Sequence, residues 1–243
     1  MIIYNLLKGG NMKLKKLFYI MILLVLLFII YLFFYSPFKK QIYIGHNNLI
    51  IDNRKPTKVK ELQEEYNNKD IVGYISIPNT NINEPILQST DNEFYLNHGI
   101  DKKKNIIGST FLDYRVKINN EKKNLIYSHN SSTFDVPFKE LEKYYNEDFY
   151  KNNKYIYLED EEKKVKYQIF SVYVETSNWD YMKLNFTDEG WLEHLNKLKS
   201  LSWYETGVNV SKDDEILILQ TCSHHKKYNN YKNKYLLIIA KKI

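Results

Sequence analysis

The chain has 243 residues, with 35 Lys and Arg against 29 Asp and Glu, which gives a formal net charge of +6. Residues 1–51 contain six lysines and no acidic residue, so residues 52–243 carry equal numbers of basic and acidic side chains. A nucleic-acid-binding domain needs positive charge on the domain itself, so this balance excludes that class, and we expect no nucleic-acid partner. A hydrophobic content of 44% excludes a disordered chain, and a lone cysteine excludes an internal disulfide.

The N-terminal segment has the composition of a membrane anchor. Residues 17–38 hold no charge, and about 20 such residues are enough to cross a membrane as a helix. Because the only alanine is Ala240, the small-residue cleavage site of a secretory signal is missing from this segment. We therefore predict a cytoplasmic N-terminus over 1–16, an uncleaved single-pass membrane anchor over 17–38 and a linker over 39–56.

The residues around the anchor raise two further points. Lys-Gly-Gly-Asn-Met at 8–12 can be encoded by a sequence that contains a bacterial ribosome-binding site. We therefore expect translation to start at Met12, which would leave residues 1–11 untranslated. Lysines before and after the apolar segment are nearly equal in number, so the positive-inside rule does not set its orientation.

Beyond the linker, hydrophobic periodicity predicts mostly strands. Thr57 is placed to cap a helix whose Val59, Leu62 and Tyr66 share one face, and a second helix is predicted over 187–201. Strands are predicted over 71–78, 82–87, 106–113, 124–128, 154–158, 165–175, 215–221 and 234–240. Short strands with irregular spacing favour a mainly β fold class, either a closed barrel or a sandwich, over a βαβ fold.

Two side chains at predicted strand ends are candidates for chemistry. Cys222 directly follows the apolar strand 215–221, and His129 follows Leu-Ile-Tyr-Ser in a polar loop. A thiol nucleophile needs a partner that favours the thiolate, and histidine is the usual one. Each residue also has a plainer interpretation, since a free cysteine is often an inert core residue and a loop histidine often makes only local hydrogen bonds.

Several motifs occur together in a fixed order. In chain order they are NKDIVGYISIPNTNINEPILQSTDNEFYLNHGI, GSTFLDYR, LIYSHN and TGVNVSKDDEILILQTC. From about residue 57 to the C-terminus the chain thereby resembles the class B sortases. That resemblance implies an eight-stranded β-barrel with N-terminal helices and a long helix before the cysteine strand. It also implies a catalytic domain over 57–243 that is held outside the cell membrane, which settles the orientation.

The resemblance also implies a reaction. Family members are cysteine transpeptidases that cut the C-terminal sorting signals of secreted proteins, and class B members favour signals of the Asn-Pro-x-Thr type. Cys222 would attack the carbonyl after the threonine to form a thioacyl enzyme. His129 would protonate the leaving amine and then assist an incoming peptidoglycan cross-bridge amine, with no cofactor. Asn92, Leu96 and Thr221 match segments that bind the substrate.

One position departs from the family pattern. Sortases place an arginine at the start of the strand after the cysteine, and here the matching string NKYLLIIA puts Lys234 in that place. Lysine keeps the positive charge but lacks the planar guanidinium with its several donors. The loss of one charge-assisted hydrogen bond costs about 1.5–3 kcal/mol, or roughly one to two orders of magnitude in rate. We expect Lys234 to be the third catalytic residue of an enzyme that is slow, adjusted in geometry, or degenerate.

Two other functions stay open. A degenerate sortase barrel that holds sorting signals without cleaving them would also tolerate the lysine. Cys222, His224 and His225 form a compact cluster that could join His129 around a zinc ion. Adjacent histidines rarely both reach one metal, and no acidic cluster with metal-site spacing stands out, so we expect no metal site.

Overall fold

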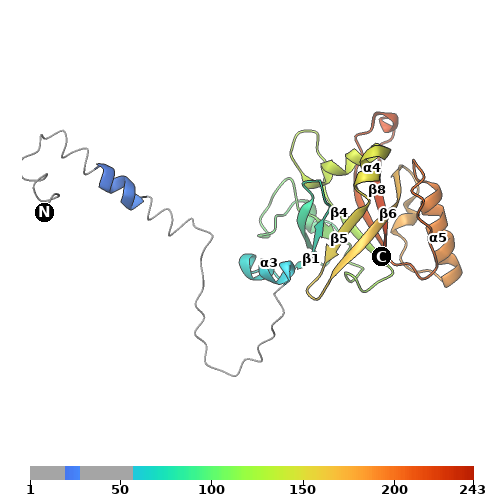
Figure 1. Ribbon diagram of the computed structural model, residues 1–243, viewed down its shortest axis with the longest axis horizontal. Helices are drawn as coiled ribbons and strands as arrows, with labels where there is room; N and C mark the ends of the chain where they lie inside the picture. Colours follow the sequence, from blue (N-terminus) through green and yellow to red (C-terminus); the bar gives the residue numbers. More distant parts are fainter. Residues whose placement is uncertain (1–19, 28–56) are drawn as a thin grey trace, which may run out of the picture. The chain divides into compact units, whose positions relative to one another are not determined.

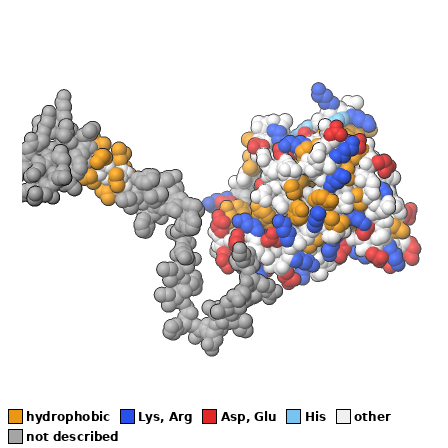
Figure 2. All heavy atoms as spheres, in the orientation of Figure 1, with side chains coloured by type: hydrophobic (Ala, Val, Ile, Leu, Met, Phe, Trp, Pro, Cys, Tyr) orange, Lys and Arg blue, Asp and Glu red, His pale blue; other side chains and the backbone are white. Residues whose placement is uncertain are grey.

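The computed structural model describes residues 20–27 and 57–243 (Figure 1). The chain divides into two units, Met1–Asn53 and Arg54–Ile243. In the first unit, the described residues 20–27 form a helix whose side chains are exposed. The second unit contains all the strands described below. On the face shown in Figure 2, basic and acidic side chains are interspersed, in keeping with the balanced charge of residues 52–243.

The predicted membrane anchor needs a correction. Among the residues that the structure describes, no helix is long and apolar enough to cross a membrane. On this finding, the prediction of a single-pass chain in the cell membrane with an extracellular domain is wrong. The predicted N-terminal segment 1–16 with its start at Met12, the linker 39–56 and the rest of the predicted anchor lie in 1–19 and 28–56, outside the described residues.

The second unit is built on a closed β-barrel. Its strands are β1 (Ile71–Ser76), β2 (Asn83–Leu87), β3 (Phe111–Leu112), β4 (Lys123–Tyr127), β5 (Tyr155–Glu159), β6 (Lys164–Glu175), β7 (Ile216–Cys222) and β8 (Tyr235–Lys242). They close in the order β1-β2-β3-β4-β7-β8-β6-β5. The predicted mainly β fold class and eight-stranded barrel are therefore confirmed. Most neighbours run antiparallel, but β4 runs parallel to β7 and β2 parallel to β3.

Helices begin at the caps that the sequence predicts. In α3 (Lys58–Tyr66), the side chain of Thr57 accepts a hydrogen bond from the Lys60 backbone N–H. In α5 (Asp188–Ser200), the Thr187 hydroxyl accepts from Gly190, and the helix precedes the cysteine strand as expected. Within 57–243 only α3 precedes β1. The other helical segments are η1 (Phe94–Leu96), η2 (Pro137–Tyr145), α4 (Glu147–Asn152), η3 (Trp179–Met182) and η4 (Lys226–Tyr228).

The cysteine strand is buried on both faces, which explains its continuous apolar sequence. Leu217 and Leu219 belong to one core cluster, which also contains side chains of η2 and α4. Ile216 and Ile218 belong to a second cluster, which contains Trp191 and its neighbours on α3 and α5. Because alternate residues of a strand point to opposite faces, one apolar run supplies both clusters. This packing fixes the strand that ends at the thiol.

The predicted strand 106–113 is much shorter in the structure. Only Phe111 and Leu112 pair as β3, because Gly108 adopts a left-handed conformation with φ +57°. A side-chain carbon at Gly108 would lie 2.6 Å from the carbonyl oxygens of Tyr95 and Leu96, so only glycine fits this close approach. The turn thus packs the chain before β3 against η1, the segment that reaches the histidine described next.

Candidate active site

The parallel pairing of β4 with β7 brings the two predicted catalytic residues together. Tyr127 is in register with Gln220, so the same offset continued along both chains pairs His129, two residues past β4, with Cys222, the last residue of β7. The pairing continues through Ser128, whose N–H donates to Gln220 O at 3.2 Å and whose carbonyl accepts from the Thr221 hydroxyl at 2.8 Å. Neighbouring strands lie about 4.8 Å apart, so residues distant in sequence become neighbours at this end of the barrel.

Cys222 is the last residue of β7 and is exposed. The surrounding protein nevertheless desolvates the sulfur, and this desolvation raises the pKa of the thiol. Tyr235 is in register with Cys222 on β8, and burial followed by the charge of Cys222 raises the pKa of its phenol. Only the thiolate is a good nucleophile, so a raised pKa leaves a minor reactive fraction at neutral pH.

His129 is half-buried and held by a backbone carbonyl. Its Nε2 lies 2.7 Å from the carbonyl oxygen of Leu96, at the end of η1. A carbonyl oxygen can only accept, so Nε2 carries a proton, and Nδ1 is the nitrogen with a free lone pair in the neutral ring. Among the described residues, no hydrogen bond joins His129 to Cys222. The ring is therefore oriented by Leu96 rather than by the thiol.

Asn130 ties the two strand ends together, a role that the sequence analysis missed. Its Nδ2 donates to the carbonyl oxygen of Cys222 at 2.8 Å, and the residue is 8% exposed. Its Oδ1 is buried without a hydrogen-bond partner in the described part of the chain. The only signal in the sequence is that Asn130 directly follows His129.

Lys234 lies next to the site, but its ammonium is directed elsewhere. The Lys234 carbonyl accepts from Ser223 N–H at 3.0 Å, and its Nζ donates to Asn229 Oδ1 at 3.0 Å. Tyr235, and not Lys234, is the register partner of Cys222. Because successive residues of a strand point to opposite faces, Tyr235 shares the face of Cys222. The structure therefore brings the Lys234 backbone, but not its charged group, to the thiol.

The three predicted substrate-binding residues differ in what they offer. Leu96 is 38% exposed, so its side chain is free to contact a ligand. Thr221 is 2% exposed, and its hydroxyl is already bonded to Ser128. Asn92 Nδ2 donates to Asp113 Oδ2 at 3.1 Å, and its Oδ1 accepts from the backbone N–H of Tyr114 at 3.0 Å. Two of the three are thus engaged within the protein.

A second segment missed by the sequence analysis stands beside the cysteine strand. The hydroxyl of Tyr181, in η3, donates to Gln220 Oε1 at 2.6 Å, two residues before Cys222. The ring of Trp179 packs against that of Tyr235 with centroids 5.4 Å apart. These aromatic side chains flank the end of β7. Because they come from an irregular polar stretch, hydrophobic periodicity could not find them.

The zinc alternative is not assembled. The ring of His225 packs edge-on against the stacked rings of Tyr145 and Trp203, with centroids 4.8 and 4.9 Å away. His224 Nδ1 lies 3.6 Å from Glu142 Oε1, while His129 is bonded to a carbonyl. Among the described residues, which include all of these side chains, no group of three or more His, Cys, Asp or Glu is placed to hold a metal ion.

Comparisons with known proteins match this geometry. The sortase domain family matches residues 75–242. Sortase B of Listeria monocytogenes is 34% identical over 200 residues, which cover 75% of this chain and 80% of that protein. Sortase B of Staphylococcus aureus is 34% identical over 160 residues, which cover 64% of each protein. The chain thus spans just under two thirds of the length of the second relative.

Solved structures give the same result. The X-ray structure of Clostridium perfringens sortase B superposes with a TM-score of 0.67 at 33% identity, covering 76% of this chain and 98% of that one. The Staphylococcus aureus sortase B–substrate complex gives a TM-score of 0.68 at 30% identity, covering 76% and 84%. Taken with the family match, these similarities show that the chain belongs to the class B sortases, a family of cysteine transpeptidases.

Proposed function

We propose that this protein is a transpeptidase that cleaves an Asn-Pro-x-Thr-like sorting signal of secreted proteins and joins the threonine to a peptidoglycan cross-bridge amine. The observation that supports the proposal is the parallel register of β4 and β7, in which Tyr127 pairs with Gln220, two residues before His129 and Cys222 respectively. A nucleophile next to a general acid–base is the minimum that two successive acyl transfers need. No cofactor enters this chemistry.

The reaction proceeds in two balanced steps. The Cys222 thiolate attacks the carbonyl carbon after the threonine, and the C–N bond breaks as His129 gives a proton to the leaving amine. The incoming amine then attacks the thioester and loses a proton to His129, and the thiolate departs. Because the Leu96 carbonyl holds the Nε2 proton, the proton that moves is the one on Nδ1. The raised thiol pKa limits the reactive fraction at neutral pH.

Lys234 supplies the positive charge for the carbonyl oxygen in this proposal. Its flexible four-carbon stem begins one residue from Tyr235, the strand partner of Cys222. To act, the ammonium leaves Asn229 and turns toward the substrate, so its bond to Asn229 describes the resting state. Leu96 is the substrate contact with the strongest support, because its side chain is exposed and its carbonyl orients His129.

A second function, peptide binding without cleavage, is favoured by two observations. The Lys234 ammonium faces Asn229, and desolvation raises the thiol pKa with no charge in the described part of the chain to offset it. This resting geometry suits a module that binds a sorting peptide without cutting it. The two functions differ in a single observable, the bond between the peptide and Cys222.

The test incubates the full chain with a panel of Asn-Pro-x-Thr peptides, with and without an amine-terminated peptide, and follows intact mass. The proposal predicts a thioacyl adduct on Cys222 and a product that carries the added amine. The matched control is Cys222→Ala, which gives neither. Binding without an adduct establishes the second function, and a folded protein that neither binds nor reacts refutes both.

A further inference from the structure

Lys123 is a buried lysine at the beginning of β4, the strand whose far end leads to His129. The residue is 2% exposed. Its Nζ lies 3.1 Å from the carbonyl oxygen of Tyr181, 2.6 Å from that of Lys183 and 2.8 Å from His194 Nε2. An ammonium has three N–H donors, and here each has an acceptor. A buried charge is tolerated only when it is satisfied in this way.

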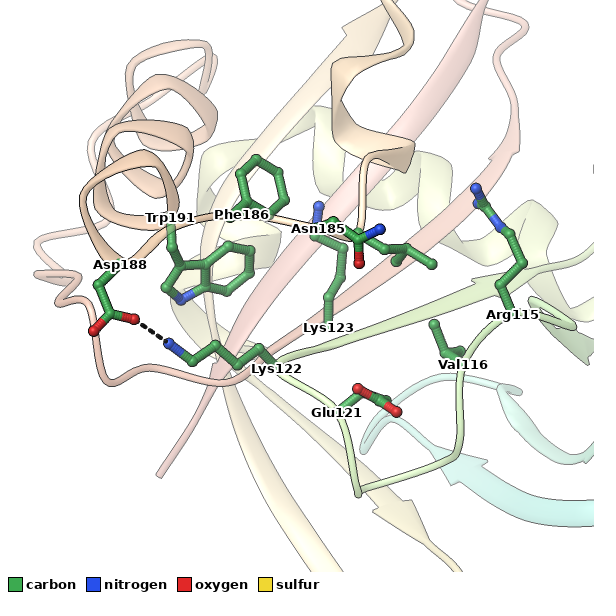
Figure 3. A pocket seen from close by; sticks show the side chains of 10 residues that line it. Arg115, Val116, Glu121, Lys122, Lys123, Asn185, Phe186, Asp188 and Trp191 are labelled. Atoms are coloured by element: carbon green, nitrogen blue, oxygen red, sulfur yellow. Dashed lines mark hydrogen bonds and ion pairs between the residues drawn. The ribbon is translucent and has the colours of Figure 1, made fainter.

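Aromatic rings complete the enclosure. The Lys123 ammonium lies 4.9 Å from the ring centre of Phe186 and 5.5 Å from that of Trp191. These side chains line a pocket of about 480 Å³, at whose rim Lys122 pairs with Asp188 at 3.3 Å (Figure 3). Ring faces attract cations, so they offset part of the desolvation of the ammonium. Lys122 and Lys123 are thus neighbours in sequence with opposite surroundings.

The arrangement survives a change in the charge of the lysine. Desolvation, with smaller contributions from the charges of Arg115 and Lys183, lowers the pKa of Lys123 to about 7. Desolvation and then the charge of Lys123 lower the pKa of His194 to about 3, so the imidazole is neutral. A neutral amine keeps two donors for the two carbonyls and accepts from His194 after a change of tautomer. Both charge states therefore hold the same two carbonyl groups.

Those carbonyl groups belong to the segment that flanks the thiol. Tyr181 lies in η3 and Lys183 follows η3, so the Lys123 ammonium binds this segment through the segment's backbone carbonyl groups. From the same segment, the Tyr181 hydroxyl reaches Gln220 on β7. Trp179 packs against Tyr235, the register partner of Cys222. One segment is therefore bonded to a buried lysine on one side and to the cysteine strand on the other.

We propose that Lys123 is a positioning residue for this sortase: its buried side chain holds segment 179–183 so that Tyr181 stays bonded to Gln220 and Trp179 stays packed on Tyr235, the strand partner of Cys222, and thereby shapes the surface that receives the sorting peptide. The inference rests on the proposed function for the identity of the ligand, while the anchoring of the segment is independent of it. A positioning role acts on peptide binding rather than on the reactivity of the thiol. The affected quantity is therefore KM.

The test compares Lys123→Met with Lys122→Met in the full chain. Methionine keeps most of the volume of the lysine stem and removes its donors. For Lys123→Met we expect KM for the sorting peptide to rise about tenfold while kcat changes less than about threefold. Amide hydrogen exchange in 179–183 should rise as well. Lys122→Met removes an exposed ion pair with Asp188 and an exposed hydrogen bond to the Lys212 carbonyl, and it should match the wild type in both measurements.

Every outcome decides the inference. A folded Lys123→Met protein with wild-type KM, or with unchanged exchange in 179–183, overturns it even if its melting temperature falls. If Lys123→Met does not fold, His194→Leu takes its place, because it removes one acceptor of the ammonium and keeps the lysine. A smaller rise in KM and in amide exchange of 179–183 then supports the inference, and wild-type values of the two overturn it. If the wild type binds peptide without reacting, Kd replaces KM. If it neither binds nor reacts, the proposed function fails, and hydrogen exchange alone decides whether Lys123 anchors the segment.

Discussion

The two ends of β4 show opposite solutions to the placement of polar groups. At its beginning, Lys123 is buried and each N–H of its ammonium has an acceptor. Past its other end, Asn130 Oδ1 is buried without a partner in the described part of the chain, and Cys222, at the end of the neighbouring β7, is exposed. The beginning of the strand satisfies its polar group within the protein, whereas the opposite end has an exposed thiol and an unpaired amide oxygen. The following substitutions test this difference, from the largest expected effect to the smallest.

Removal of the thiol should have the largest effect on activity. Cys222→Ala takes away the only nucleophile of the proposed reaction, so turnover and the thioacyl adduct should both disappear. Because the side chain lies at an exposed strand end, the urea midpoint of unfolding should stay close to that of the wild type. Activity and intact mass of the folded variant check this. Residual turnover above background would show that another group carries the chemistry.

Replacement of His129 should slow the reaction but leave the Cys222 thiol in place and reactive. His129→Gln retains a donor for the Leu96 carbonyl but removes the acid–base group, and such a loss costs about 10²–10⁴-fold in kcat. Alkylation of Cys222 by iodoacetamide should change little, because the structure shows no bond between the imidazole and the thiol. Steady-state kinetics beside an alkylation time course measure both effects. A kcat within a factor of two of the wild type would remove His129 from the mechanism.

The charge at Lys234 should have an intermediate effect. Lys234→Ala is expected to lower kcat/KM about 10- to 100-fold, which corresponds to the loss of one charge-assisted hydrogen bond. Lys234→Arg should retain or raise the rate of thioacylation. Asn229→Ala is the matched control, because it frees the ammonium from its resting partner without removing the charge. Equal activity in all three variants would show that Lys234 is idle.

The buried pair at the other end of β4 should influence stability through pH. The pKa of His194 falls from an unfolded value near 6.5 to about 3, so between these values the unfolded chain binds a proton that the folded chain does not. The free energy of unfolding therefore decreases as pH drops from about 6.5 toward 3. His194→Gln should lose less stability than the wild type between pH 7 and pH 4.5, as measured by urea unfolding. Equal losses would argue that the imidazole is not held neutral.

Much of the fold and part of the site follow from local sequence patterns. Cys222 is a candidate because it follows an apolar strand, and that strand is buried on both faces as its composition indicates; its catalytic role is implied by the family resemblance. His129 follows a strand in the same way, but its partnership with Cys222 came from the family resemblance. The parallel pairing of β4 with β7 is a long-range feature that periodicity does not contain.

Other features could not be predicted because packing determines them. Nothing in the sequence distinguishes the burial of Lys122 from that of Lys123, yet α5 and the loop before it bury only Lys123. Strand register decides whether Lys234 or Tyr235 shares the face of Cys222, since a shift of one residue moves a side chain to the other face. Thr221 was expected to bind substrate, but its hydroxyl is occupied by Ser128. These outcomes depend on contacts between segments far apart in the chain.

The central claim is that the adjacent ends of β4 and β7 carry out acyl transfer to an amine through Cys222. The most direct measurement is a single-turnover time course of intact mass, in which the full chain is mixed with a reactive sorting peptide and then with an amine-terminated peptide. The account predicts that an adduct located on Cys222 forms first and is then discharged to the amine-linked product. A product that forms without any Cys222 adduct, or an adduct that the amine does not discharge, would contradict it.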